Sequence, residues 1–220
     1  MINNHVGAPS ITPKAKIYTL SFWLLCGSSF LFFGSFSMIL PELPDYLASL
    51  NGQEYLGFVV SLFTLSAAVS RPFSGKLTDK WGRTPVMFIG ACISGLAALI
   101  YPLTTTVFGF LIIRFLHGFS AGFKPTGTSA YVADIIPSNR RGEAMGILSM
   151  FGTIGMASAP ILVSWIFLTY DINTLFYCSS VFSIGSVLIL FGMKETLKNK
   201  DPFKLALLKI GKADLYEPSV

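Results

Sequence analysis

Six long apolar blocks, separated by short polar segments, follow one another along the chain. Each is close to the roughly 20 residues that a helix needs to cross a bilayer, and lipid offers no partner for backbone groups left outside a helix. We therefore predict an all-α membrane protein built as a bundle of six transmembrane helices. The predicted helices occupy residues 17–40, 55–72, 85–101, 107–136, 144–168 and 172–193.

This pattern divides the chain into three parts. Residues 1–16 form a polar N-terminus, residues 17–193 the transmembrane domain, and residues 194–220 a basic segment. Apolar side chains are interleaved with lysines from residue 201 onward, which predicts a short amphipathic helix lying along the membrane surface. A disordered tail is the alternative.

Basic residues lie on alternate connections between the predicted helices. Lysine and arginine occur before the first helix, between the second and third, between the fourth and fifth, and after the sixth. The other three connections, 42–54, 102–106 and 169–171, contain neither. Because cytoplasmic loops carry the excess of basic residues, we predict that both termini are cytoplasmic and that the chain is a multi-pass protein of the plasma (inner) membrane.

The composition removes several other interpretations. Charged residues make up 12% of the chain, about half the usual share for a soluble domain. The net charge of +5 is sorted by loop, which argues against nucleic acid as a partner. The cysteines lie in apolar blocks without metal-ligand spacing, so no metal or other cofactor is expected. The only histidines are His5 and His117, and no nucleophile–base motif indicates an enzyme.

The most specific motif runs from Gly75 to Arg83, with the sequence Gly-Lys-Leu-Thr-Asp-Lys-Trp-Gly-Arg. We expect it on the cytoplasmic loop between helices two and three, where Gly75 allows a close approach and Gly82 a sharp turn. It resembles the signature loop G-x-L-x-D-x-x-G-R of the major facilitator superfamily. In such a loop Asp79 and Arg83 suit a network that switches partners, and we expect Arg83 to bridge Asp79 and Asp134 by hydrogen bonds.

Helix four carries two further resemblances to the same family. Residues 114–122 are similar to R-x-x-Q-G-x-x-x-G, with His117 in place of the glutamine. Asp134 begins a match to D-x-x-P-x-x-x-R-G that ends at Arg141 and the glycine after it. We expect Asp134 and Arg141 at the cytoplasmic surface, in one conformational switch with the signature loop. The matches follow the order, and lie on the helices, that the family requires.

A weaker resemblance lies in helix five. Gly155, Ala159 and Pro160 match the antiporter motif G-x-x-x-G-P, with alanine in place of the second glycine. That departure leaves the direction of transport open. The alternative interpretation of the small residues is close packing of helix backbones.

The resemblance implies the N-terminal six-helix half of a secondary active transporter. Such a protein moves a small-molecule substrate by alternating access, here with proton-coupled export as the expected mode. Uptake is an alternative, and so is a non-transporting assembly or regulatory protein. Members of the family have twelve or more helices, so we expect a missing C-terminal half, or a second half-transporter, as partner.

Helix four also carries the ionisable residues expected deepest in the membrane. Arg114, His117 and Lys124 are spaced by three and seven residues, which places them on one helix face. Charges there cost about 2.5–3.5 kcal/mol on insertion scales, so the face should look inward. It could form the anion-attracting or proton-linked wall of a cavity. Alternatively, Arg114 binds carbonyl groups, His117 is a neutral hydrogen-bonding residue, and Lys124 extends toward the surface.

Overall fold

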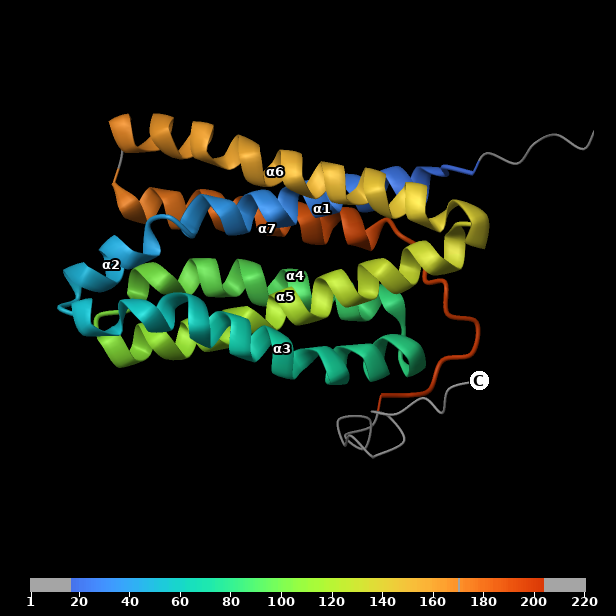
Figure 1. The fold of residues 1–220 in the computed structure, drawn as a ribbon, viewed down its shortest axis with the longest axis horizontal. Helices are drawn as coiled ribbons and strands as arrows, with labels where there is room; N and C mark the ends of the chain where they lie inside the picture. The colour runs from blue at the N-terminus through green and yellow to red at the C-terminus, as the bar shows by residue number, and fades with distance from the viewer. Residues whose placement is uncertain (1–16, 170, 204–220) are drawn as a thin grey trace, which may run out of the picture.

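The computed structural model describes residues 17–169 and 171–203, and its regular elements are all helical (Figure 1). Six helices in this part are long and apolar enough to cross a membrane, as predicted. The elements are α1 (Leu20–Ile39), α2 (Leu43–Ser49), η1 (Gln53–Tyr55), α3 (Leu56–Lys80), α4 (Arg83–Ile100), η2 (Tyr101–Leu103), α5 (Val107–Ile135), η3 (Ser138–Arg140), α6 (Arg141–Thr169) and α7 (Ile172–Phe191).

The second transmembrane helix is longer than its apolar block. α3 continues through Pro72 and ends at Lys80, so most of the signature motif is helical and only Trp81 and Gly82 connect it to α4. The prediction that the motif lies on a loop was therefore wrong. Charged residues end an apolar block without ending a helix, because lysine is a good helix former and its long side chain reaches the membrane surface.

The segment after α7 runs without a helix as far as residue 203. It lies under one end of the bundle, where the backbone N–H of Asp201 donates to the carbonyl of Lys80 and the Phe203 ring packs 5.2 Å from Trp81. The predicted amphipathic helix falls almost entirely on residues 204–220, outside the described part of the chain.

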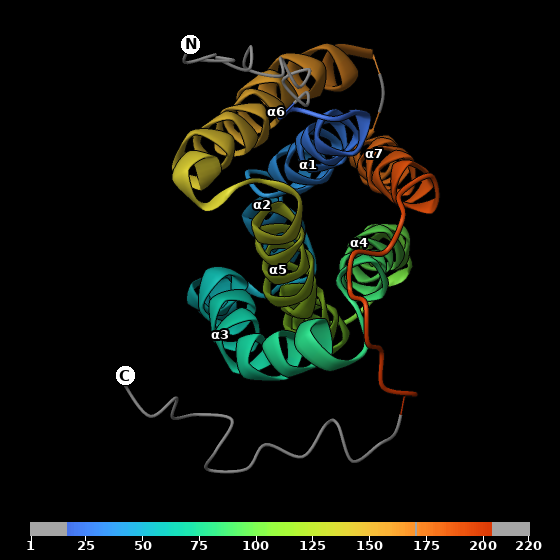
Figure 2. The same cartoon turned by 90° about the vertical axis from the view of Figure 1, so that its right-hand side faces the viewer.

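The first three membrane-spanning helices (α1, α3, α4) and the last three (α5, α6, α7) are interleaved in the bundle. α1 packs against α6 and α7, whereas α5 packs against α3 and α4, and α4 and α7 close the bundle on the far side (Figure 2). The first helix of each consecutive triplet thus lies between the second and third helices of the other triplet. Such a 3+3 arrangement is typical of transporters with internal inverted repeats.

Serine side chains hold α7 in place. The hydroxyl of Ser28 on α1 lies 2.8 Å from that of Ser186, and Ser180 donates to the carbonyl of Gly95 on α4 at 3.1 Å. Hydrogen bonds of this kind, beside small residues, join helices where lipid leaves no hydrophobic force to do so. Ser28 therefore lies on a packing surface between α1 and α7.

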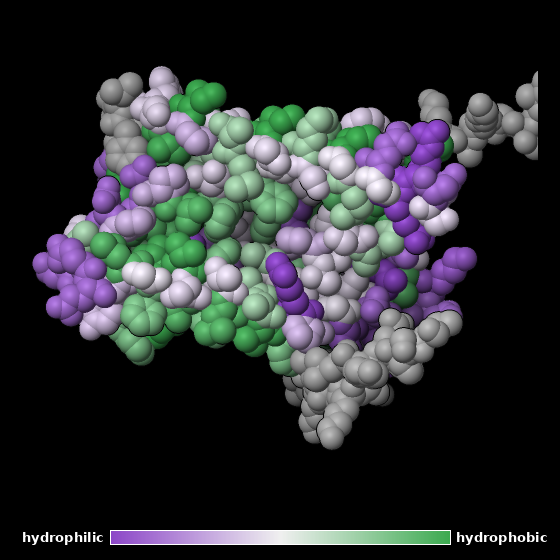
Figure 3. Space-filling view, viewed as in Figure 1, coloured by the Kyte–Doolittle hydropathy of each residue, from purple (hydrophilic) through white to green (hydrophobic). Residues whose placement is uncertain are grey.

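One broad side of the bundle is formed by α1, α3, α5 and α6 (Figure 1). α3 and α6 stand at its edges, with α1 and α5 between them (Figure 2). Figure 3 shows hydrophilic side chains gathered at the two ends of this side and mostly hydrophobic or neutral ones between them. We call this side the open face.

Candidate functional site

A network of charged and hydroxyl side chains joins three helices at the end of the bundle where α3 meets α4. Arg83, the first residue of α4, donates from Nε to Oδ2 of Asp134 at 2.9 Å and from Nη1 to the carbonyl of Thr78 at 2.6 Å. Its Nη1 lies 3.7 Å from Oδ1 of Asp79, an ion pair too long for a hydrogen bond. Of the two expected bridges, only the one to Asp134 is therefore a hydrogen bond.

The turn at Gly82 positions Arg83. Gly82 has φ of +143°, in the region that only glycine adopts readily, so the turn expected at this residue is present. A Cβ atom at this position would also collide with the carboxylate of Glu195. The positive φ is the main reason for glycine at this turn, and a larger residue would also displace the Glu195 carboxylate.

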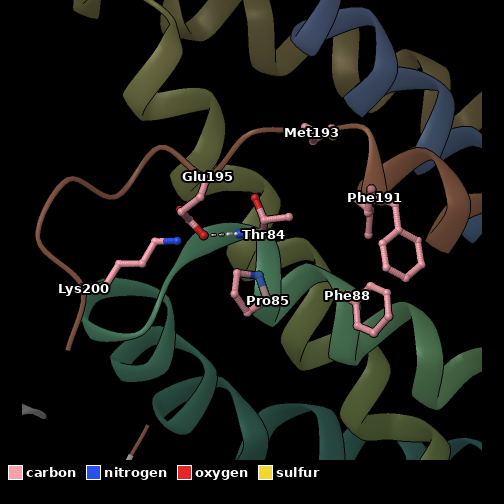
Figure 4. Close-up of a pocket in the computed structure, with 8 residues that line it drawn as sticks. Thr84, Pro85, Phe88, Phe191, Met193, Glu195 and Lys200 are labelled. Carbon is pink, nitrogen blue, oxygen red and sulfur yellow. Dashed lines mark hydrogen bonds between the residues drawn. The ribbon is translucent and has the colours of Figure 1, made fainter. Parts of the chain in front are cut away.

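Glu195 and Thr196 belong to the network but were not predicted from the sequence. The Glu195 carboxylate accepts a 3.1 Å hydrogen bond from the backbone N–H of Thr84 (Figure 4). It accepts a second, also of 3.1 Å, from the N–H of Arg83, at the N-terminus of α4 where the helix dipole favours a negative charge. It also accepts 2.9 Å bonds from the N–H groups of Thr196 and Leu197. The available signal was a single acidic residue in the otherwise basic segment 194–200.

The neighbouring hydroxyl closes the network. Thr196 donates from its hydroxyl to Oδ2 of Asp134 at 2.6 Å, so one carboxylate oxygen binds both Arg83 and Thr196. We call Asp79, Arg83, Asp134, Glu195 and Thr196 the signature network. It connects α3, α4 and α5 to the segment that follows α7.

Two expected members of this site lie outside the signature network. Arg141 donates to the carbonyls of Ala133 and Ile136, at 2.7 Å and 3.3 Å, and so satisfies the C-terminal end of α5. At Gly75, no described atom of another residue lies within 4 Å of the position that a Cβ atom would occupy. The close approach expected at Gly75 therefore does not occur within the described chain.

Arg114 joins α5 to α3 inside the bundle. Its Nε donates to the carbonyl of Val59 at 2.6 Å, and its guanidinium carbon lies 4.3 Å from the centre of the Phe63 ring. Nη1 and Nη2 are buried and have no hydrogen-bond partner in the described part of the chain. Arg114 thus has the carbonyl contact of a structural residue together with two unused donors.

His117 and Lys124 are buried beside different neighbours. The imidazole Nδ1 of His117 lies 3.3 Å from the Tyr101 hydroxyl and Nε2 lies 3.3 Å from the Ser94 hydroxyl, both on the α4 side. One nitrogen can accept while the other donates, as in a neutral histidine. Nζ of Lys124 lies 4.9 Å from the centre of the Phe32 ring on α1. The three residues are all buried, as their spacing predicts, but they do not contact one another by hydrogen bonds.

The helix-five motif lies at the contact between α6 and α1. A Cβ atom at Gly155 would overlap the carbonyl of Phe30, and Ala159 is buried against Met38. Pro160 is exposed. The small residues of this motif therefore allow two helix backbones to approach closely.

The sequence was compared with known families and proteins. The Major Facilitator Superfamily model matches residues 25–213. Multidrug resistance protein 2 of Bacillus subtilis (strain 168) is 30% identical over 186 residues, which cover 84% of this chain and 46% of that protein. Multidrug resistance protein MdtG of Rahnella sp. (strain Y9602) is 31% identical over 194 residues, covering 85% and 47%. The chain spans about half the length of the curated relatives it matches.

Solved structures show the same fold at low sequence identity. The human organic anion transporter MFSD10 superposes with a TM-score of 0.72 at 19% identity, over 90% of this chain and 53% of that one. The inward-open xylose transporter XylE from E. coli gives 0.69 at 17% identity, over 82% and 49%. The family match covers most of the sequence and agrees with the helix arrangement, so the chain belongs to the Major Facilitator Superfamily.

Proposed function

We propose that this chain is the N-terminal half of a secondary active transporter that exports small molecules in exchange for protons. The observation that carries this proposal is the signature network. It holds the ends of three helices and the segment after α7 by charge-assisted bonds, which are strong and directional and can form in one state and break in another. Relatives named multidrug resistance proteins support export of small organic molecules.

In this proposal the inward face of α5 provides the substrate and proton pathway. Arg114, His117 and Lys124 are the ionisable side chains buried there, and no Asp or Glu is buried in the described part of the chain. A buried cation without a fixed counter-charge favours an arriving anion or the loss of its own proton. His117, whose two ring nitrogens face hydroxyl groups, would hold or pass a proton between Tyr101 and Ser94.

The proposal includes a second six-helix bundle as partner. Small or hydroxyl side chains recur every three or four residues along exposed sides of α3 and α6, the helices at the edges of the open face (Figure 2), and form two stripes. The stripes are Gly57, Ser61, Thr64 and Ala68 on α3, and Gly142, Gly146, Ser149, Thr153 and Ala157 on α6. A Cβ atom built at Gly57, Gly142 or Gly146 would have no described atom within 4 Å beyond its chain neighbours and its own helix backbone. Small residues at this spacing let other helices pack closely in a membrane.

Transport in vesicles tests the function. The chain is co-expressed with the C-terminal half of the Bacillus subtilis relative, and inside-out vesicles are given an acidic lumen. We expect a fluorescent drug to accumulate while the lumen becomes more alkaline, and neither change without the second half. Accumulation only in right-side-out vesicles would indicate uptake, and pairing without any flux would indicate a regulatory protein.

The partner is tested separately by co-purification of the two halves. Gly146→Leu should weaken pairing at least tenfold while leaving the isolated chain as stable as the parent, because the position faces open space. Leu188→Trp on α7 is the matched control, since its side chain is 63% exposed on the side away from the open face. Equal pairing by both variants would show that the stripes are not the interface.

A further inference from the structure

A small cavity opens between α5 and α6, with α1 as its floor. Its volume is about 130 Å³. Ser129 and Ser149 stand exposed at its rim, while Lys124 lies inside at 1% exposure. The walls are formed by Phe32, Phe33, Met145 and Leu148, together with the hydroxyl-bearing residues Ser29 and Thr128.

The Lys124 side chain is buried, and no hydrogen bond joins its ammonium group to another described residue. Its Nζ lies 4.9 Å from the centre of the Phe32 ring, whose face is negatively polarised. An ammonium group carries three donors, and a buried charge is ordinarily paired. The described residues therefore leave the donors of this ammonium group available to a bound anion.

No carboxylate among the cavity's lining residues balances this charge. The nearest buried charge along the same helix is Arg114, which is also a cation. Low-dielectric walls around charges of one sign concentrate their field and attract ions of the opposite sign. The cavity thus supplies a positive charge, hydroxyl groups at its rim and aromatic walls.

We propose that this cavity binds the anionic head group of an amphipathic organic anion, through Lys124, and makes such anions substrates of the transporter. The inference rests on the proposed function and specifies its substrate class. Cavities that enclose drug-sized ligands measure about 300–1,000 Å³, so this one holds a head group such as a carboxylate. The apolar remainder of the molecule lies along the open face.

Direct binding to the purified chain tests the proposal without requiring transport. Benzoate, benzamide and benzylammonium have the same ring and differ in charge. In phosphatidylcholine nanodiscs we expect benzoate to bind at least tenfold more tightly than the other two, measured by ligand-observed NMR. Lys124→Met should reduce benzoate affinity at least tenfold and leave benzamide unchanged, whereas Lys80→Gln, an exposed lysine outside the cavity, should change neither.

A second variant tests the same site without removing Lys124, in case Lys124→Met fails to fold. Ser149→Trp places a large side chain at the exposed rim, where the fold tolerates it, and should block benzoate while Lys124 is retained. Unchanged benzoate binding by either variant would overturn the proposal. So would loss of benzoate binding in nanodiscs containing phosphatidylglycerol, because the occupant would then be a lipid head group. Absence of flux with intact benzoate binding would instead count against the proposed transport function.

Discussion

Oδ2 of Asp134 accepts two hydrogen bonds, from Nε of Arg83 at 2.9 Å and from the hydroxyl of Thr196 at 2.6 Å. One carboxylate oxygen thus ties α5 to the start of α4 and to the segment after α7. The two donors reach it from parts of the chain that are 113 residues apart in sequence, since Thr196 and Arg83 differ by that number. Loss of this carboxylate would therefore remove two contacts of the signature network at once.

Replacement of Arg83 tests how much its hydrogen bonds contribute to the stability of the chain. Arg83→Lys keeps the charge but loses the second donor, which Arg83 uses on the carbonyl of Thr78. We expect the free energy of unfolding to fall by about 1.5–3 kcal/mol, the usual contribution of a hydrogen bond to a charged group. Thermal unfolding in nanodiscs measures the change.

Arg140→Lys provides the control for this substitution. Arg140 binds Glu143 at 2.8 Å, but both side chains are about half exposed. Such surface pairs contribute about 0–1 kcal/mol. Equal destabilisation by the two arginine-to-lysine changes would mean that the signature network has no special role in stability.

Glu195 should protect the backbone amides at the start of α4. Glu195→Gln leaves one acceptor oxygen where the carboxylate has two, and Oε2 is the atom that binds the N–H of Thr84. We expect hydrogen exchange at Thr84 to become about ten- to a hundredfold faster, the equivalent of one charge-assisted bond. Glu143→Gln, at an exposed site, should leave Thr84 unaffected, and protection of Thr84 in the Glu195 variant would refute the contact.

Two glycines of the same motif should respond differently to alanine. Gly82→Ala meets both a positive φ and the Glu195 carboxylate, so we expect a loss of at least about 1 kcal/mol in stability. Gly75→Ala meets open space and lies in a helix, where alanine is favoured by up to about 1 kcal/mol. Opposite shifts in the unfolding temperature are expected. A destabilised Gly75→Ala chain, without any partner present, would contradict this account.

Membrane orientation follows from the loop charges and can be measured directly. Reporter fusions after Lys16, Arg83, Arg141 and Lys200 should be cytoplasmic, whereas fusions near Gly52 and Asp171 should be external, because basic residues stay inside. An external signal at Arg83 would reverse the assignment. The fusions at Gly52 and Asp171 serve as the internal controls.

The sequence was sufficient to predict the six helices and the inward direction of Arg114. Both depend on the cost of exposing backbone groups or charges to lipid, which acts on each helix separately. The residues at which helices end were harder to predict, since α3 continues past its apolar block to Lys80. Its last residues are polar and lie at the membrane surface, where hydropathy carries no information about helix ends.

Contacts between distant segments could not be predicted. Glu195 reaches the start of α4 because the chain turns back under the bundle after α7, a path that no local pattern specifies. Arg141 was expected with the carboxylates and instead binds carbonyls of α5, because those groups at the helix end lack internal partners. The packing of α1 between α6 and α7, and of α5 between α3 and α4, likewise depends on contacts between helices distant in sequence.

The ten residues that separate Arg114 from Lys124 place these cations about 15 Å apart along α5. An elementary charge that crosses the whole membrane does electrical work of about 2.3 kcal/mol per 100 mV. If the bundle rocks so that water reaches these cations first from one side and then from the other, each is moved through part of the voltage drop. The membrane potential would then set the balance between inward- and outward-facing states, even for cargo that carries no charge.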